Sequence, residues 1–410
     1  MKKGQVDTHV LVLVTLGLTA FGLVMVYSAT SAPAALGGGD PVFYLKREGI
    51  YALIGVALLM VGSRADYRAL RFLAPVLMLT SLGLCFAVLA IGEQVNGARR
   101  WLGVGSLTFQ PSELAKLSLA IWAAAYLARR PAPRTLKELA RPIGLTTGLF
   151  AALILLEPDL GTVIAIGIVL GAILVVSGTP LRVLAAGGSI AFGLAMAAIW
   201  FEPYRRARFF SFLDPGHDPQ GAGYQTFQGI MGLGSGGFFG VGIGHGVQKV
   251  NYLPEAHTDM IFATIGEELG LLGASLVIAA YVAFAYAGLR VALRCKDPFG
   301  KRLAAGMTTL VCGQALINLA AVLGLAPLTG ITLPFVSYGG SSLIVSLASV
   351  GVLLNIAGHG SAARAQVPDR SRGDGRPRAA VARGRGGARG ARRQGDLRRV
   401  AGSHRGAARS

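Results

Sequence analysis

Apolar runs of about bilayer length recur along most of this sequence and constrain its fold more than any other feature. They lie at roughly 9–29, 48–63, 72–92, 113–129, 143–157, 160–178, 182–201, 261–289, 303–325 and 342–358. A helix of about 20 apolar residues spans a bilayer. Only 14% of the residues are charged, against about a quarter in soluble domains. The sequence therefore predicts an all-α polytopic membrane protein with about ten transmembrane helices and a large loop before the eighth. The runs at 48–63 and 143–157 are short for a full crossing, so the number of transmembrane helices could differ by one pair.

The loops between these runs differ in positive charge. Lys and Arg are concentrated at the N-terminus, at 64–71, 129–141 and 290–302, and beyond 360, whereas the alternate loops carry fewer. The positive-inside rule then predicts that both termini are cytoplasmic and that the loop at 202–260 is external. The first run follows Lys2 and Lys3 and is interpreted as a retained signal-anchor.

The sequence predicts two parts, a membrane domain at 1–360 and a disordered Arg/Gly-rich cytoplasmic tail at 361–410. RGG-like runs in the tail could bind nucleic acid. Attraction to anionic lipid head groups fits a segment beside the membrane better, so no nucleic-acid partner is expected.

Two patterns indicate no cofactor. The three cysteines, Cys85, Cys295 and Cys312, lie in or beside apolar runs and have no spacing typical of a disulfide framework or a metal site. The glycine-rich stretch at 232–244 formally contains G-x-G-x-x-G, but no strand precedes it and no Lys-Ser/Thr follows. We interpret it as a loop on the membrane surface whose backbone N–H groups and a lipid-linked ligand approach each other closely. Lys249, just after it, adds a cation.

Charged residues also stand at the predicted external ends of helices. Arg99 and Arg100 flank Trp101 and would form a cationic, aromatic surface suited to a phosphate on an apolar chain. Glu113 and Lys116 lie three residues apart, on one helical face, where they could pair. The pair could be purely structural. Its depth in the membrane makes such charges costly and favours a functional site.

Two further motifs combine helix-capping residues with acids. In the turn at 157–162, Asp159 could cap the next helix, or Glu157 and Asp159 could form an acidic cluster. In the stretch at 254–259, Thr258 or Asp259 could cap the long helix that follows. Alternatively, Asp259 could be a general base, with Glu255 and His257 beside it. The helix dipole lowers and desolvation raises the pKa of Asp259, and the sequence does not decide between them. Glu267 and Glu268 have no assigned role.

Six ordered motifs resemble those of the SEDS proteins of bacterial cell-wall synthesis. They are NGARRW at 96–101, QPSELAK at 110–116, EPDLGT at 157–162, YLPEAHTD at 252–259, GEELG at 266–270 and PFVSYGGSS at 334–342. The resemblance covers about residues 8–358. The form of the fourth motif is more similar to the division member of the family than to the elongation member. Met260, where the family usually has Phe, and the tail depart from the pattern.

The resemblance implies an inverting peptidoglycan glycosyltransferase that polymerises lipid II outside the bacterial plasma membrane, with undecaprenyl pyrophosphate as leaving group. It implies that Asp259 is the catalytic residue and that Glu113, Lys116 and Asp159 line an external cavity. Arg99, Arg100, Lys249, Glu255 and His257 are the further candidates for binding substrate. The expected partners are lipid II, the growing glycan, a class B penicillin-binding protein and other division proteins at the septum. No cofactor is required, although a divalent cation (Mg²⁺ or Mn²⁺) could assist. An elongation polymerase, a lipid II flippase and a scaffold are the alternatives.

Overall fold

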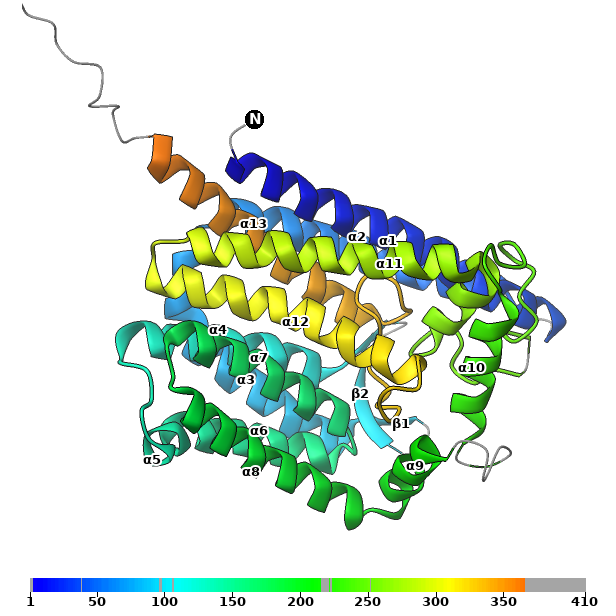
Figure 1. The fold of residues 1–410 in the computed structure, drawn as a ribbon, viewed down its shortest axis with the longest axis horizontal. Helices are drawn as coiled ribbons and strands as arrows, with labels where there is room; N and C mark the ends of the chain where they lie inside the picture. The colour runs from blue at the N-terminus through cyan, green and yellow to red at the C-terminus, as the bar shows by residue number, and fades with distance from the viewer. Residues whose placement is uncertain are drawn as a thin grey trace, which may run out of the picture. The chain divides into compact units, whose positions relative to one another are not determined.

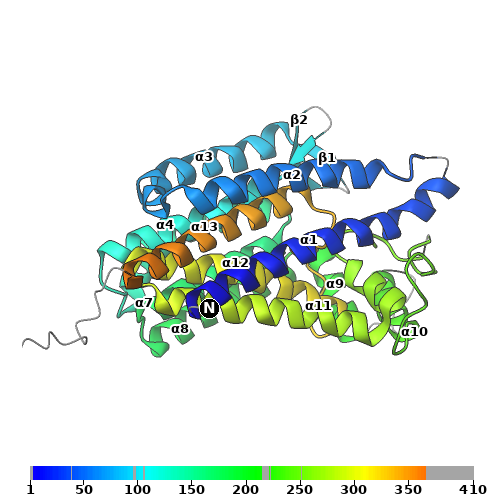
Figure 2. The same cartoon turned by 90° about the horizontal axis from the view of Figure 1, so that it is seen from above.

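A computed structural model describes residues 3–37, 39–95, 98–104, 107–214, 221, 223–250 and 252–365 of the chain. Within these ranges the chain is mostly helical, and its long helices run side by side (Figures 1 and 2). They are α1 (Lys3–Leu36), α2 (Phe43–Arg64), α3 (Leu70–Ile91), α4 (Pro111–Arg129), α6 (Leu145–Leu156), α7 (Leu160–Ser177), α8 (Leu181–Trp200), α11 (Ile261–Arg294), α12 (Pro298–Val322) and α13 (Gly340–Ala365). A 3-10 turn, Tyr67–Ala69, leads into α3, and α5 (Leu136–Leu139) with a π-helical turn, Ala140–Gly144, leads into α6.

Eight helical segments among the described residues are long and apolar enough to cross a membrane. The α2 and α4 helices run beside them in the same bundle (Figure 2) and carry more charge, including Lys46, Arg47 and Glu48 in α2. These elements match the predicted polytopic fold of about ten helices. The protein is therefore an integral membrane protein.

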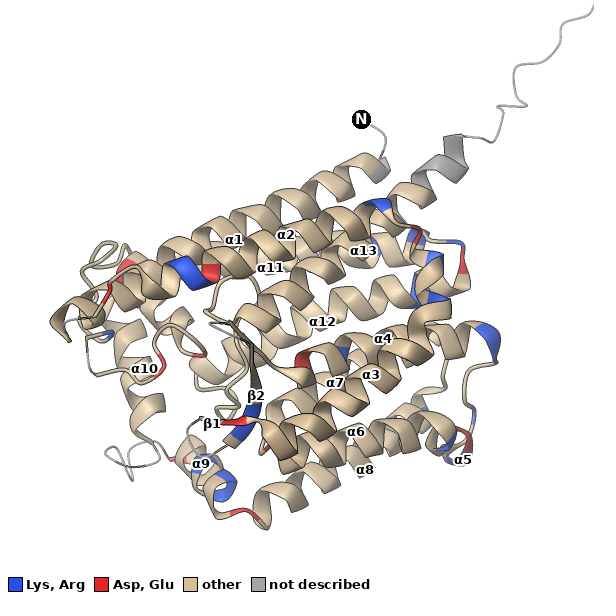
Figure 3. Cartoon of the chain, turned by 180° about the vertical axis from the view of Figure 1, so that it is seen from behind, with Lys and Arg blue, Asp and Glu red and all other residues tan. Residues whose placement is uncertain are grey.

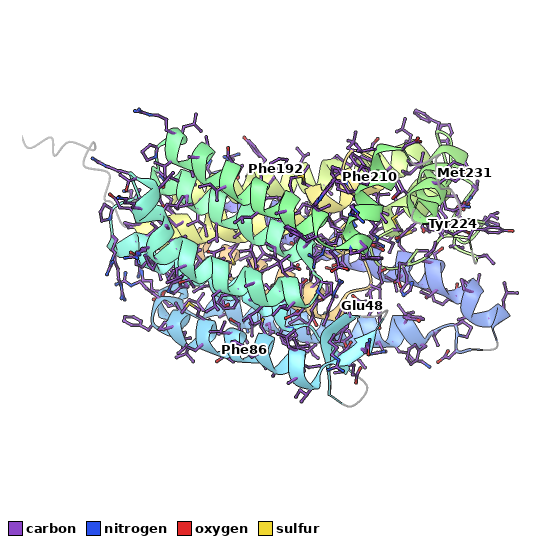
Figure 4. The ribbon with its side chains drawn as sticks, turned by 90° about the horizontal axis from the view of Figure 1, so that it is seen from below. Glu48, Phe86, Phe192, Phe210, Tyr224 and Met231 are labelled. Carbon is purple, nitrogen blue, oxygen red and sulfur yellow. The ribbon has the colours of Figure 1, made fainter. Side chains whose placement is uncertain are left out.

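The central helices are α12 and α13, which are the most buried of the spans. The α12 helix packs against α4, α7 and α11, and α13 packs along α2. Glycines allow the last contact: a Cβ at Gly351 would lie 2.5 Å from the backbone oxygen of Leu59. Small residues commonly permit such approaches between membrane helices. By contrast, Phe86 of α3 and Phe192 of α8 are largely exposed on the outer surface of the bundle (Figure 4), as expected of a surface that contacts lipid.

One end of the bundle carries the connections with the most structure. A small antiparallel sheet, ordered β1 (Glu93–Val95), β2 (Ala98–Val104) and β3 (Leu107–Phe109), pairs Gln94 with Arg99 and Gly103 with Thr108. The large loop before α11 contains α9 (Pro203–Leu213) and α10 (Tyr224–Ser235). The sheet, α9 and α10 lie at the same end of the bundle (Figures 1 and 2). The sequence predicted loops here and none of these elements.

Near this end, α11 is interrupted at Gly270, which has φ 65° and ψ −164°. The glycine-rich segment pairs with the break, since Val241 N and Gly242 N donate to the carbonyl oxygens of Glu267 and Glu268. A Cβ at Gly236 would lie 1.9 Å from Gly266 O, so the two backbones touch. This stretch therefore lies against the backbone of α11, and the predicted approach of a lipid-linked ligand to 232–244 stays a prediction.

The predicted tail is only partly within the described residues. The α13 helix continues to Ala365, past the expected boundary at 360. The rest of the Arg/Gly-rich segment, 366–410, lies outside the described residues, and its predicted disorder stays a prediction.

Candidate functional site

Asp259 lies just before α11 and is buried although it caps no helix. The N-cap position belongs to Met260, and no side chain there bonds to the helix. The Asp259 carboxylate instead accepts hydrogen bonds at 3.4 Å from Gln225 Nε2 and at 3.3 Å from Thr258 Oγ1. Thr258 also donates to the backbone and the carboxylate of Glu255. The alternative that Thr258 or Asp259 caps the helix is therefore wrong.

Burial dominates the acidity of Asp259. Desolvation raises the pKa of this carboxyl to about 6, against the opposing pull of the Arg208 guanidinium and with a smaller contribution from the Glu255 charge. The sequence left the competition between desolvation and the helix dipole open, and desolvation wins. A carboxylate with a pKa near 6 is mostly ionised at neutral pH yet holds a proton more readily than an ordinary aspartate, as a general base requires.

The segment at 329–331 lies between Asp259 and the start of α7. Asn318 Nδ2 of α12 donates to Asp259 O at 2.7 Å and to Ile331 O at 2.8 Å. A Cβ at Gly330 would lie 4.0 Å from Asp259 Oδ2, and one at Gly161 would lie 2.9 Å from Thr329 O. The two acidic motifs, which are about a hundred residues apart, therefore contact the same short segment.

Asp159 caps α7, as one of the two interpretations predicted. Its carboxylate accepts from Thr162 N at 3.0 Å, from Thr162 Oγ1 at 2.8 Å and from Gln110 Nε2 at 3.1 Å. Glu157 is fully buried, and burial raises the pKa of its carboxyl to about 8. Burial therefore favours the protonated form of this carboxyl, and a functional acidic cluster of Glu157 and Asp159 stays a prediction.

The two arginines of the predicted cationic surface, Arg99 and Arg100, have different surroundings. Arg100 of β2 donates from Nε to Glu157 O at 2.7 Å and from Nη2 to Pro158 O at 2.6 Å. It therefore holds the turn that contains Asp159. Arg99 pairs across the sheet with Gln94 and is exposed.

Glu113 and Lys116 form the ion pair that their spacing predicts. Lys116 Nζ lies 2.7 Å from Glu113 Oε1, and both side chains are buried in the first turns of α4. The helix is joined to α13, because Gln110 N donates to Ser341 Oγ at 2.9 Å. Gln110 thus connects the start of α4 to both Asp159 and α13.

Lys249 also lies in a buried ion pair, with partners other than those of the Asp259 carboxylate. Its Nζ is 2.5 Å from Glu268 Oε1 and 3.1 Å from Ser28 Oγ of α1. The Glu267 carboxylate accepts from Val247 N at 2.7 Å and from Gln248 N at 3.1 Å. Glu267 and Glu268, which had no assigned role, therefore join the segment 247–249, just after the glycine-rich stretch, to α11.

His257 lies between two tyrosines. Its ring centroid is 4.8 Å from that of Tyr44 on α2 and 5.5 Å from that of Tyr338, whose backbone N donates to His257 O at 2.8 Å. Burial lowers the pKa of His257, so the ring is neutral at physiological pH. Glu255 is exposed and has a positive φ of 56°.

Sequence reasoning missed Arg208, Gln225 and Asn318, the partners of Asp259 on α9, α10 and α12. None belongs to a recognised motif, and only the folded loop brings them to Asp259. Among the described residues, no three His, Cys, Asp or Glu side chains gather where they could hold a metal ion. The predicted optional divalent cation stays a prediction.

Comparisons with known proteins agree on one family. Residues 8–362 match the family described as "Cell cycle protein", which groups FtsW, RodA and SpoVE. The chain is 41% identical over 350 residues to a probable peptidoglycan glycosyltransferase FtsW of Geobacter sulfurreducens, covering 85% of this chain and 94% of the relative. It is 42% identical over 349 residues to the protein of the same description in Nitrosococcus halophilus, covering 83% and 89%.

Two solved structures have a similar fold. A chain of a peptidoglycan synthase complex that coordinates polymerization and crosslinking matches with a TM-score of 0.72 and 32% identity, over 85% of this chain and 97% of that one. The rod shape determining protein RodA of Thermus thermophilus matches with a TM-score of 0.63 and 31% identity, over 85% and 95%.

Proposed function

The chain belongs to the FtsW, RodA and SpoVE family of cell cycle proteins, and from this premise we propose that it is a peptidoglycan glycosyltransferase that polymerises lipid II into glycan strands on the external side of the plasma membrane. One observation carries the proposal beyond the names of its relatives. The buried Asp259 carboxylate caps no helix, and burial raises its pKa to about 6. A carboxylate that is costly to bury and does not cap the helix beside it is expected to serve the chemistry.

In the proposed reaction, Asp259 accepts the proton of the GlcNAc 4-hydroxyl on the acceptor lipid II. That oxygen forms a bond to the anomeric carbon of the MurNAc at the reducing end of the growing glycan. The bond from this carbon to the pyrophosphate oxygen breaks with inversion, and undecaprenyl pyrophosphate leaves with the electron pair. The leaving group is already stable as an anion, so one base suffices.

Cations near the site would stabilise the charge that develops on the leaving group. Arg99 is exposed, and Arg208 is half-buried, where it donates to Gln225 and acts on the Asp259 carboxyl; these two are the proposed candidates. Arg100 is committed to two carbonyls, and Lys116 and Lys249 are committed to buried carboxylates. A role for these three in binding substrate requires that their contacts rearrange.

The proposed sidedness comes from charge. Lys and Arg gather at the bundle end with α5 and the start of α12 (Figure 3), including Arg134, Lys137, Lys301 and Arg302. We assign this end to the cytoplasm, together with both termini. The end with Asp259 then faces outward, where a polymerase must add to the wall.

Septal synthesis during division is the proposed setting, because the similar relatives are described as FtsW. A class B penicillin-binding protein is the proposed partner, since one similar fold belongs to a complex that both polymerises and crosslinks peptidoglycan. An elongation role, as in RodA, is the second candidate, supported by the similarity to that fold. A flippase is less well supported, because Asp259, Asp159 and Arg99 all lie at one end of the bundle rather than at its middle.

The test is reconstitution of the protein with its transpeptidase partner, supplied with lipid II. Asp259→Asn is expected to lower the rate of glycan formation about 10²–10⁴-fold, the usual contribution of a general base. Asp214→Asn, which changes an exposed carboxylate at the end of α9, is the matched control and keeps the wild-type rate. Glycan formation by Asp259→Asn at the control rate would refute the assignment, and lipid II movement between leaflets without polymerisation would favour the flippase. Removal of divalent cations with EDTA, followed by Mg²⁺ or Mn²⁺, tests the metal requirement.

A further inference from the structure

Gln225 connects the proposed base to the two helices of the large loop. It is buried in the first turn of α10. Its Nε2 lies 3.4 Å from Asp259 Oδ1 and 3.4 Å from Pro254 O, and its Oε1 accepts a hydrogen bond of 3.0 Å from Arg208 Nη2 of α9. Figure 4 shows Phe210 of α9 and Tyr224 of α10 at this end of the molecule.

The chemistry of the three groups fixes the orientation of the Gln225 amide. Arginine has only hydrogen-bond donors, so the amide oxygen must face Arg208. The amide nitrogen then faces Asp259 and Pro254 O, both of which are acceptors. A rotated amide would place oxygen against the carboxylate and nitrogen against the guanidinium, leaving both contacts unfavourable. Gln225 can therefore transmit the position of α9 to the Asp259 carboxylate.

We propose that Gln225 is a positioning residue, whose amide orients the Asp259 carboxylate and links it to Arg208, so that the placement of α9 and α10 controls the readiness of the base to accept a proton. This inference rests on the proposed function, in which Asp259 is the base. It extends that function by making the loop, rather than the membrane helices alone, responsible for the competence of the site.

The groups around Asp259 determine whether its pKa rises or falls when the Gln225 side chain is changed. Arg208 on α9 is the cation that stabilises the ionised form, and Glu255 in the same segment opposes it. From α12, the uncharged Asn318 amide contacts the backbone of Asp259, not its carboxylate. In α11, the Glu267 carboxylate accepts hydrogen bonds from Val247 N and Gln248 N, and Glu268 forms an ion pair with Lys249. Loss of the Gln225 donor therefore removes stabilisation of the carboxylate, and the pKa of Asp259 rises.

Two variants of Gln225 change this link without changing Asp259. Gln225→Ala removes the donor and the anchor of Arg208. Gln225→Glu is nearly isosteric and sets a second carboxylate beside Asp259. A like charge at this distance is expected to move the midpoint of the acid limb of the pH profile upward by about one pH unit. Gln225→Ala should move this midpoint upward by less. Gln228→Ala, three residues further along α10 and outside the chain of hydrogen bonds, is the control and leaves the limb unchanged.

The experiment has two readouts on the full-length protein. The first is the pH dependence of glycan formation from lipid II. The second is the pH dependence of Asp259 labelling by dicyclohexylcarbodiimide, which reacts with protonated carboxyl groups, followed by peptide mass spectrometry. Labelling needs no catalytic activity and reports protonation directly. Both midpoints should move upward in the Gln225 variants.

The outcomes separate the two proposals. If the wild type makes glycan but the midpoints of the Gln225 variants stay at the wild-type pH or fall, the positioning role is wrong and the proposed function stands. If the wild type makes no glycan, the proposed function is wrong, and the labelling midpoints alone decide whether Gln225 governs protonation of Asp259. A uniform loss of activity with unchanged midpoints indicates a merely structural role for Gln225 and also overturns the inference.

Discussion

A carboxylate at the entrance of a membrane helix experiences two opposing influences, and Asp259 shows which one prevails. The positive end of the helix dipole acts mainly through direct hydrogen bonds in the first turn. Asp259 makes none of these, because the helix begins after Met260. Burial therefore prevails, and the residue keeps a proton affinity suited to catalysis near neutral pH.

The acidity of Asp259 predicts the pH dependence of the enzyme. The base acts only when deprotonated, and its pKa is raised to about 6. Activity is then fully present above this pH and falls about tenfold for each unit below it, whereas an unperturbed aspartate would lose activity only below about 4. The profile of kcat/KM for lipid II between pH 4.5 and 8 would reveal the limb. An acid limb near pH 4 would contradict the assignment.

The buried pair of Lys116 and Glu113 makes a prediction about stability. Lys116→Met leaves the Glu113 carboxylate buried without its partner, which typically costs about 3–5 kcal/mol. The double variant with Glu113→Gln should recover most of this loss, because no isolated charge remains. The free energies of unfolding of the single and the double variant, measured in detergent, test this prediction.

An exposed pair in the same protein is the control for this measurement. Lys46 and Asp40 lie 2.9 Å apart with largely exposed side chains, and Lys46→Ala should cost less than about 1 kcal/mol. If Lys116→Met costs no more than Lys46→Ala, burial does not strengthen the pair of Lys116 with Glu113.

At the scale of elements, the break in α11 explains the glycine-rich segment. Backbone groups freed at the break must be satisfied inside the protein, since lipid offers them no partner. Leu271 N and Leu272 N donate to Gly237 O and Phe238 O, and this pairing needs both backbones in contact. Glycine supplies the closeness and the positive φ that the turn requires.

Gly270 is therefore expected to tolerate no side chain. A Cβ there would lie 2.4 Å from Gly240 N, and φ of 65° strains any other residue. Gly270→Ala should lower the free energy of unfolding by at least the usual cost of such strain, about 1–3 kcal/mol. It should also make residues 236–249 accessible to protease. Gly167→Ala, in α7 where the added Cβ meets open space, should be neutral or slightly stabilising. Equal stability of the two variants would show that the break is adaptable.

The sequence predicted the long helices because apolar length is a local property. It missed α9, α10 and the sheet, because these elements are short and their stability depends on packing against the end of the bundle. It also predicted the local contacts, such as the cap at Asp159 and the pair of Lys116 with Glu113. The contacts of Asp259 with Gln225 and Asn318 join residues 34 and 59 positions apart. Nothing in local spacing indicates them.

At the scale of the whole molecule, the orientation in the membrane decides whether the site can reach its substrate. Arg206 of α9 and Lys137 of α5 are exposed at opposite ends of the bundle (Figure 1). The proposed orientation predicts that a membrane-impermeant maleimide labels Arg206→Cys in intact cells and labels Lys137→Cys only after permeabilisation. Both variants are made with Cys85, Cys295 and Cys312 replaced by alanine.

Each labelling result leads to a different conclusion about this orientation. Labelling of Lys137→Cys alone in intact cells would reverse the orientation and place Asp259 on the cytoplasmic side, where wall polymerisation is excluded. Equal labelling of both before permeabilisation would mean that the bundle does not separate the two ends. The expected pattern places the base, the aromatic pair around His257 and the exposed Arg99 outside the cell. The growing glycan could then remain in the wall while each lipid-linked precursor arrives laterally through the membrane.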